Sequence, residues 1–175
     1  MQPIFETRRL IVRPRTEADT ELCFAMDSDP EVTRFVTGPW SDQQEHRAFI
    51  EARTRGPYPE GMGYWAVCLR KQPDRFIGWV LLIPIDAVGP EVEIGWRMRR
   101  DAWGRGYATE AARAVLTHAF KRLGLMEVVA DLDPDNVGSR RVAEKIGLKA
   151  GLPRLHHGRT AIRYRASAAK SRALT

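Results

Sequence analysis

Three apolar segments follow one another closely in the middle of the chain, and this run most constrains the fold. Residues 64–69, 75–85 and 92–98 have the length and the aromatic or β-branched content typical of strands. The connections between them, KQPD and DAVGP, contain the proline, glycine and aspartate that favour turns. Strands joined this closely pair antiparallel, because a parallel pair needs a crossover of about a dozen residues. The sequence therefore predicts an antiparallel meander.

A long helix follows the meander. Apolar residues recur at intervals of three and four positions over residues 108–123, as on one buried helical face, and Gly124 supplies a left-handed stop. A strand at 127–132, a shorter helix that ends at Gly147 and a closing strand at 160–166 are expected after it.

Two further helices are expected before the meander, after a short strand at residues 10–13. Thr16 with Asp19, and Ser41 with Gln44, have the three-residue spacing of helix starts. The residues expected to face the core from these helices are Leu22, Cys23, Met26, Phe49 and Ile50. The order β-α-α-β-β-β-α-β-α-β predicts an α+β fold, a mixed, mostly antiparallel twisted sheet covered by helices.

Length and composition fit one soluble globular domain. The chain has 175 residues, 43% of them hydrophobic and 29% charged, and no apolar run reaches the ~20 residues of a membrane span. We expect a single domain over residues 1–165 and a disordered tail over 166–175. The start of the chain lacks the layout of a signal peptide. Cys23 and Cys68 lack metal-like spacing and suit buried free thiols, so we expect a cytoplasmic protein. The lack of a long apolar run predicts that it does not engage a membrane.

The net charge of +6 is concentrated in the second half of the chain. Residues 1–87 carry 11 basic and 13 acidic side chains, whereas residues 88–175 carry 17 basic and 9 acidic ones. This surplus would attract a multiply charged anionic ligand, and it would attract nucleic acid as well. The arginine pairs 99/100 and 140/141 fit nucleic acid, but the sequence lacks the interleaved aromatic residues and the motifs typical of nucleic-acid-binding modules.

The stretch WGRGYATEA, residues 103–111, places two glycines at the start of the long helix. Main-chain N–H groups there have no partner within the helix, and glycines let a phosphate approach them closely. Arg105 lies between the glycines, and Arg99 and Arg100 precede them. A turn that serves only packing is the alternative. The spacing matches neither a P-loop nor the dinucleotide fingerprint. Glu110, in the first turn, is expected to interact with the helix dipole.

With VEIGWRM before it and DPDNVGSRRVAEKIG after it, this loop resembles that of the GNAT superfamily of acetyl-CoA-dependent N-acetyltransferases. The family signature [Q/R]-x-x-G-x-[G/A] falls on residues 103–108, with Trp103 as a departure in the first position. The likeness extends over about residues 5–165. The opening ETRRLIVRPRTEAD makes the chain similar to the branch that includes ribosomal-protein N-terminal alanine and serine acetyltransferases.

The resemblance implies a site for acetyl-CoA, and no metal is expected because the histidines lack metal-ligand spacing. The strand at residues 93–98 would hold the pantetheine arm through its main chain, and the amides of residues 103–109 would hold the pyrophosphate. The strand at 128–132 would diverge from residues 93–98, with a bulge near Gly95. The residues expected to bind the cofactor are Trp96, Arg97, Met98, Trp103, Gly104, Arg105, Gly106, Tyr107, Ala108, Thr109, Asn136 and Ser139.

The implied reaction is direct acetyl transfer to a primary amine, on a protein N-terminus or a small molecule. Ser139 is the candidate donor to the leaving thiolate, because Ala143 stands where many family members have a tyrosine. A structural role in a helix capped by Asn136 is the alternative. Glu93 is the candidate base, and an ion-paired strand carboxylate is its alternative. The four histidines lack metal-ligand spacing, and His118 is expected on the helix surface.

The acceptor is the least constrained part of the prediction. Residues 34–65 are expected to line its pocket, and Trp40, Tyr58, Tyr64 and Trp65 suggest an apolar wall, although core packing explains Trp65 equally well. Two alternatives remain on the same fold: an inactive acyl-CoA-binding protein and a basic nucleic-acid-binding module. A homodimer rests on analogy alone.

Overall fold

The computed structural model describes residues 1–156 and 158–168. Within these residues, one eight-stranded sheet has the order β1-β2-β3-β4-β5-β6-β8-β7. Its strands are β1 (Phe5–Glu6), β2 (Leu10–Pro14), β3 (Gly63–Leu69), β4 (Gln72–Pro84), β5 (Val92–Met98), β6 (Glu127–Leu132), β7 (Lys149–His156) and β8 (Arg159–Ser167). Neighbouring strands are antiparallel except for β5 and β6. The predicted α+β fold and the central meander are confirmed.

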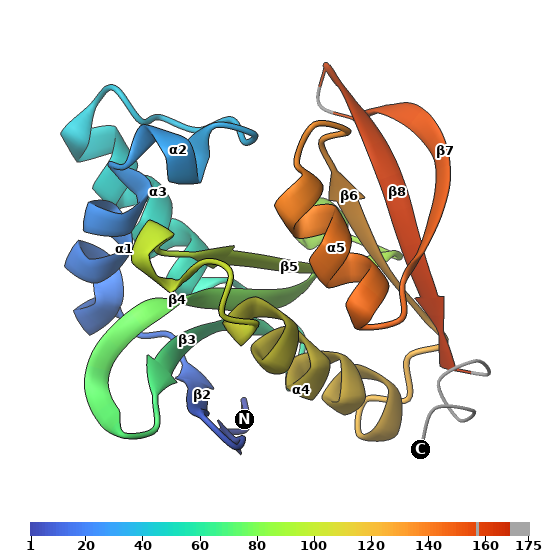
Figure 1. Cartoon of the computed structure of the whole chain (residues 1–175), viewed down its shortest axis with the longest axis horizontal. Helices are drawn as coiled ribbons and strands as arrows, with labels where there is room; N and C mark the ends of the chain where they lie inside the picture. The colour runs from blue at the N-terminus through green and yellow to red at the C-terminus, as the bar shows by residue number, and fades with distance from the viewer. Residues whose placement is uncertain (157, 169–175) are drawn as a thin grey trace.

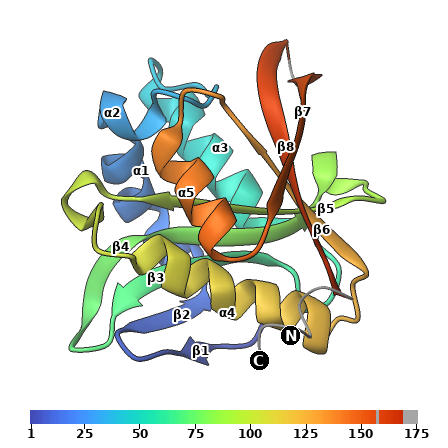
Figure 2. The same cartoon turned by 45° about the vertical axis from the view of Figure 1, so that its right-hand side comes forward.

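Helices cover both faces of this sheet. They are α1 (Thr20–Asp27), α2 (Pro30–Thr33), α3 (Gln43–Arg55), α4 (Tyr107–Lys121) and α5 (Val137–Lys145). Helices α1 and α3 lie on one face of the β2–β5 part, α4 runs along its other face, and α5 lies beside β6 (Figures 1 and 2). Each helix closes over an apolar layer, as amphipathic helices must.

Side chains of the central strands alternate between two apolar layers, because successive residues of a strand face opposite ways. Val80 and Ile94 belong to the layer that α4 covers, whereas Leu81 belongs to the layer under α1 and α3. On β5 this alternation directs Trp96 toward α4. It directs Glu93 and its alternate neighbours toward α1 and α3. The face of the sheet on which a β5 side chain lies therefore decides whether it can contact a ligand on the α4 side or one on the α1/α3 side.

The only parallel neighbours among the described strands, β5 and β6, share one register pair, Glu93 with Val129. Beyond that pair β6 turns away from β5 and carries β8, β7 and α5 with it (Figure 1). The expected divergence of the two strands is thus present. The expected bulge near Gly95 is wrong, because β4 and β5 pair without a register shift from Val92 to Met98. The divergence is set by where β6 packs and not by an extra residue in β5.

Three short or irregular elements were not predicted. Strand β1 has two residues, and α2 has one turn. Strand β7 contains glycine and proline and lacks alternation, so it resembles a loop in sequence. It lies at the sheet edge, where proline is tolerated, and its register shifts between Ala150 and Pro153.

Local details also differ from expectation. The side chain that caps α3 is Asp42, not Ser41, and it accepts from the Glu45 amide at 2.8 Å. Leu22 is exposed rather than buried. His118 is buried and not on the surface, because its Nε2 contacts the Gly61 carbonyl oxygen at 2.9 Å.

Strand β8 continues to Ser167, two residues beyond the expected domain boundary, and pairs there with Glu127. The rest of the expected tail, from residue 169, lies outside the described residues. No helix of the described residues is long and apolar enough to span a bilayer.

We predict that Gly78→Ala disrupts the β4–β5 pair. A Cβ at Gly78 would lie against the Arg97 carbonyl oxygen and 2.6 Å from Met98 Sδ, with φ at +153°. The expected cost is more than ~2 kcal/mol of unfolding free energy, measured by urea denaturation. Gly138→Ala is the control: its Cβ would meet only Asn136 Oδ1, at 3.7 Å, inside α5. That change should be neutral or stabilising by up to ~1 kcal/mol, and equal losses in both variants would contradict the packing argument.

Candidate active site

The glycine loop before α4 is open. Gly104 and Gly106 have left-handed φ values of 72° and 77°, both are exposed, and a Cβ at Gly104 would meet nothing within 4 Å. None of the amides of residues 104–109 donates a hydrogen bond to a described residue, whereas the Trp103 amide donates to the Arg100 carbonyl at 3.2 Å. The loop therefore presents a run of six amides, and the Trp103 amide, which was expected to belong to it, is bonded within the preceding turn.

A brace from the β1–β2 turn holds this loop. The Glu110 carboxylate accepts from Thr7 Oγ1 at 2.6 Å, from the Arg9 amide at 2.9 Å and from Arg9 Nε at 2.7 Å. Arg9 also donates to the Arg105 carbonyl at 2.9 Å and lies over the Tyr107 ring. Glu110 thus ties the first turn of α4 to another part of the chain, besides any interaction with the helix dipole.

The free edge of β5 presents the main chain of Trp96 and Met98 toward β6. The main-chain amide of Arg99 donates to the Ile77 carbonyl at 2.9 Å. Arg97 lies two residues earlier on the strand, so it also directs its main-chain N–H and C=O toward β4. Alternate residues direct theirs the other way. The Met98 carbonyl already accepts from Trp103 Nε1 at 2.8 Å, which leaves its amide and the main chain of Trp96 along this edge.

The structure directs Arg97 away from the expected cofactor position. Its guanidinium bonds the buried carboxylate of Asp27 at 2.9 Å and lies near the rings of Trp40 and Trp79. The sequence could not show this, because Asp27 is far away along the chain. Arg97 supports the contact between α1 and β5. Its guanidinium is bonded to Asp27 and its main chain pairs with Trp79 on β4, so neither group is free for the cofactor.

Asn136 and Ser139 lie where β6 gives way to α5. Asn136 Oδ1 accepts from the Ser139 amide at 3.0 Å, which is an N-cap bond, so the helical role foreseen for both residues is present. The Ser139 hydroxyl has no hydrogen-bond partner among the described residues. Because α4 and α5 follow β5 and β6, both helix N-termini lie beyond the carboxyl ends of the diverging strands, a common position for ligands.

Most cations around the glycine loop already have carboxylate partners. Arg99 pairs with Asp101 at 3.1 Å, and Arg100 pairs with Asp29 at 3.0 Å. Arg105 is exposed and has no ion pair among the described residues. Of the three arginines near the loop, Arg105 is therefore the one with its charge uncompensated by an ion pair.

Glu93 lies partly buried on the α1/α3 face of β5, and its carboxylate has no hydrogen bond or ion pair among residues 1–156 and 158–168. Burial raises the pKa of Glu93 to about 7, and the charge of Asp131 adds to this rise. The cations Arg53 and Arg163 act in the opposite direction. A carboxyl group that titrates near neutrality can accept a proton at physiological pH, which suits a base better than an ion-pair member.

Aromatic side chains surround this same face. Tyr64 contacts Trp79 and Tyr58, with ring centroids 5.3 and 6.0 Å apart, and the Trp40 ring lies 5.9 Å from that of Phe49. Three of the four predicted wall residues therefore cluster on the side of Glu93. The fourth, Trp65, is fully buried on the α4 side, so it is a core residue.

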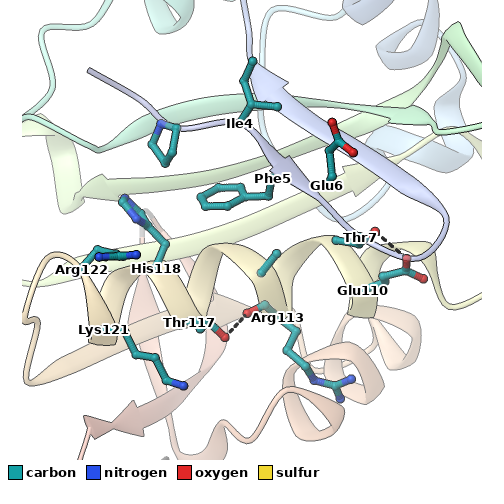
Figure 3. Close-up of a pocket in the computed structure, with 12 residues that line it drawn as sticks. Ile4, Phe5, Glu6, Thr7, Glu110, Arg113, Thr117, His118, Lys121 and Arg122 are labelled. Atoms are coloured by element: carbon teal, nitrogen blue, oxygen red, sulfur yellow. Dashed lines mark hydrogen bonds between the residues drawn. The ribbon is translucent and has the colours of Figure 1, made fainter.

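A groove of about 780 Å³ lies elsewhere, between β1 and α4 (Figure 3). Phe5 and His118 reach into it from opposite walls, and the Thr7–Glu110 bond lies at one end. None of the residues predicted to bind cofactor or acceptor lines it. It is separate from the candidate site, although it shares two residues of the brace.

Sequence reasoning missed four residues around the site: Thr7, Arg9, Arg53 and Asp27. Thr7 and Arg9 lie in the opening motif that carries part of the family resemblance, which was a usable indication. Nothing in the local pattern marks Arg53 or Asp27. No group of three or more potential metal ligands occurs among the described residues.

Comparisons with known proteins agree with this geometry. The family model described as an acetyltransferase (GNAT) domain matches residues 9–149. FsC-acetyl coenzyme A-N(2)-transacetylase of Aspergillus fumigatus is 32% identical over 159 residues, which span 84% of this chain and 65% of that protein. The YkkB protein of Bacillus subtilis is 33% identical over 144 residues, 81% of this chain and 83% of that protein.

Solved structures show the same fold. An acetyltransferase from Agrobacterium tumefaciens is 29% identical, with a TM-score of 0.78 over 95% of each chain. A ribosomal alpha-N-protein acetyltransferase, solved in complex with coenzyme A, has a TM-score of 0.74 over 94% of this chain and 98% of that one. Its sequence identity is 16%, so it supports the fold alone.

We predict that Glu110→Ala lowers the unfolding free energy by about 1–3 kcal/mol at pH 7, because three donors lose their charged acceptor. Glu45→Ala is the control, since Glu45 is also a first-turn glutamate but is exposed. Its change should stay within ~0.5 kcal/mol. Similar losses in both variants would mean that the dipole, not the brace, stabilises α4.

The contacts of Glu110 also predict that its effect on stability depends on pH. Burial alone would raise the pKa of Glu110, but the bonds from Thr7 and Arg9 outweigh it and lower that pKa. A depressed carboxyl pKa stabilises the fold above the ordinary value and loses that effect as pH falls through the folded value. The gap between the wild type and Glu110→Ala should therefore narrow in urea denaturation at about pH 3. A difference in unfolding free energy that stays constant with pH would contradict the lowered pKa of Glu110.

Proposed function

This chain belongs to the GNAT family and is an acetyltransferase, and we propose that it transfers the acetyl group of acetyl-CoA directly to a primary amine. The observation that carries the proposal is the combination of an open run of amides at residues 104–109 with two strands that part after Glu93. An extended anionic ligand with a diphosphate fits both features at once. The name of the fungal relative, an N(2)-transacetylase, supports nitrogen as the acceptor atom.

The residues of this chain fit acetyl-CoA. Amides of residues 104–109 would hold the diphosphate, with Arg105 supplying charge. The main chain of Trp96 and the Met98 amide would hold the pantetheine arm along the free edge of β5. Asn136 and Ser139, at the start of α5, would close the other side. No side chain fills the space at Gly104, so a phosphate can approach the backbone there.

Bound acetyl-CoA supplies an activated thioester, and the protein supplies position and proton transfer. Glu93 accepts the proton that the attacking amine must lose, since its pKa of about 7 lets it be ionised in the cell. The thioester oxygen also needs a donor, and whichever amide of Trp96 or Met98 is not bonded to the pantetheine arm would supply it. The Ser139 hydroxyl donates a hydrogen bond toward the leaving sulfur. Its acidity is weak, so it orients and stabilises more than it protonates.

The acceptor reaches the site from the α1/α3 face, where Glu93 and the aromatic cluster lie. Protein N-terminal amines and small-molecule amines are both chemically suited to a base there. The resemblance to the ribosomal-protein branch favours a protein N-terminus, whereas the fungal relative is named for an N(2) acceptor. The basic pair Arg99 and Arg100 is compensated by aspartates, which weakens the case for nucleic acid.

We predict that acetyl-CoA stabilises the protein by ~2.7 kcal/mol at a hundredfold excess over Kd, seen as a rise in Tm. Gly104→Asp should reduce this rise far more than Gly104→Asn. Both residues tolerate a left-handed backbone, and they differ in the negative charge that would face the diphosphate. The expected difference in Kd between the two variants is at least about tenfold. Equal affinities would place the diphosphate elsewhere.

We predict that Glu93→Gln lowers kcat by about 10²- to 10⁴-fold while the Tm rise with acetyl-CoA stays unchanged. In the wild type, kcat/KM should rise as pH increases through about 7, when Glu93 loses its proton. The variant should lack this limb and keep only the one from the acceptor amine. Release of the coenzyme A thiol measures both. An unchanged pH profile would remove Glu93 from the role of base.

Glu93 also predicts a trend in stability. Its folded pKa is raised, so between the ordinary carboxyl value and about 7 the folded state holds a proton that the unfolded state has released. Stability should fall as pH rises through this window. Glu93→Gln should abolish that fall in urea denaturation, and a fall that persists would show that another group causes it.

A further inference from the structure

Arg53 of α3 is held beside Glu93 in an unusual way. Its Nη1 donates to the Tyr64 hydroxyl at 3.1 Å, and its guanidinium lies over the Phe49 ring at 4.5 Å from the centroid. Tyr58 fixes the backbone here by donating its hydroxyl hydrogen to the Arg53 carbonyl at 2.9 Å. Aromatic groups thus position this guanidinium, and no carboxylate among the described residues lies within ion-pair distance of it.

Other arginines on the same helix have carboxylate partners. Arg47 bonds Glu21 at 2.6 Å, and Arg55 bonds Glu17 at 2.6 Å. Across the site, Arg97 bonds Asp27, and the buried Arg163 donates to Asp131 and Glu91. Arg53 is exposed, and the Tyr64 hydroxyl occupies only part of its donor capacity. It can therefore accept a bidentate carboxylate from a ligand.

The sheet places this cation next to the candidate base. Tyr64 pairs with Leu81 on β4, and Leu81 pairs with Gly95 on β5. Glu93 is two residues from Gly95 and so faces the same side. Arg53 is close enough that its positive charge works against the rise of the Glu93 pKa. An acceptor bound between them would meet a base at its amine and a cation at a neighbouring group.

We propose that Arg53 determines acceptor specificity by binding a carboxylate of the acceptor, so that the preferred substrate is an amine that also carries a free acid group, as in an amino acid or an acidic peptide. The proposal rests on the function proposed above and names the substrate class of that site. Tyr58, which is half-buried and bonds the Arg53 carbonyl, would pack against the apolar part of such an acceptor.

The test compares each amino acid with its own carboxamide as acceptor, measured by release of the coenzyme A thiol. The two differ in charge and little in size. We expect kcat/KM to favour the acid by about 10- to 100-fold, the effect of a hydrogen-bonded charge pair at a partly exposed site. Dipeptide amides with and without an acidic second residue distinguish a small acceptor from a peptide, because the blocked C-terminus leaves the side chain as the only acid group.

Variants assign this preference to Arg53. In assays at about pH 9, where Glu93 is ionised with or without the charge of Arg53, Arg53→Gln should remove it by raising KM for the acid, with little change in kcat and less than about a twofold change for the carboxamide. Arg53→Lys should restore part of it, because a lysine keeps the charge but not the bidentate geometry. Arg55→Gln, two residues further along α3, is the matched control and should keep the wild-type preference.

The outcomes separate the two proposals. Equal use of acid and carboxamide by the wild type, or an equal loss for both in Arg53→Gln, would overturn the role of Arg53 and leave acetyl transfer standing. A Tm rise with acetyl-CoA but no turnover of any amino acid or dipeptide would also count against it. Loss of both the Tm rise and all thiol release would overturn the proposed function itself.

Discussion

The single register pair between β5 and β6 is the constraint on which the rest of the structure depends. Parallel strands that stayed paired would satisfy each other's main chain and leave no edge for a ligand. Here the second half of the sheet turns away with α5 (Figure 1). Trp96 and Met98 therefore keep main-chain groups along a free edge. Because helices follow both strands, the same divergence brings two helix N-termini to one side. Unpaired polar backbone is costly to bury, and an extended ligand rich in acceptors can satisfy it.

The glycine loop depends equally on distant support. Left-handed glycines let the chain turn and expose its amides, but they also make the loop conformationally free. Glu110 limits that freedom, since it ties the first turn of α4 to Thr7 and Arg9. Arg9 in turn bonds the carbonyl of Arg105. The site is therefore made of local backbone geometry held by contacts between residues about a hundred positions apart.

Charge on the acceptor side follows a simple pattern. Most buried or partly buried ions there are paired, as the cost of desolvation requires. Arg97 and Arg163 both have carboxylate partners. Among the described residues of this face, Glu93, the exposed Arg53 and the buried Arg15 have no ion pair, and Arg15 instead lies over the Tyr64 ring and donates to the Ile50 carbonyl at 3.4 Å. Burial raises the pKa of Glu93 to about 7. Aromatic side chains hold the Arg53 guanidinium in place but do not neutralise its charge. Groups left in that condition are available to a substrate.

The sequence by itself determined the elements whose causes lie within a few residues. The meander follows from strands joined by short turns, the start of α4 from two glycines, and the cap of α5 from Asn136. Only the tertiary structure decided what depends on packing between distant segments. It placed β7 at an edge despite its proline, buried His118, gave Arg97 to Asp27 and brought Arg53 beside Glu93. The local sequence pattern determines backbone conformation. The partner of a side chain depends on which distant surfaces pack together, and no local pattern in the sequence shows that.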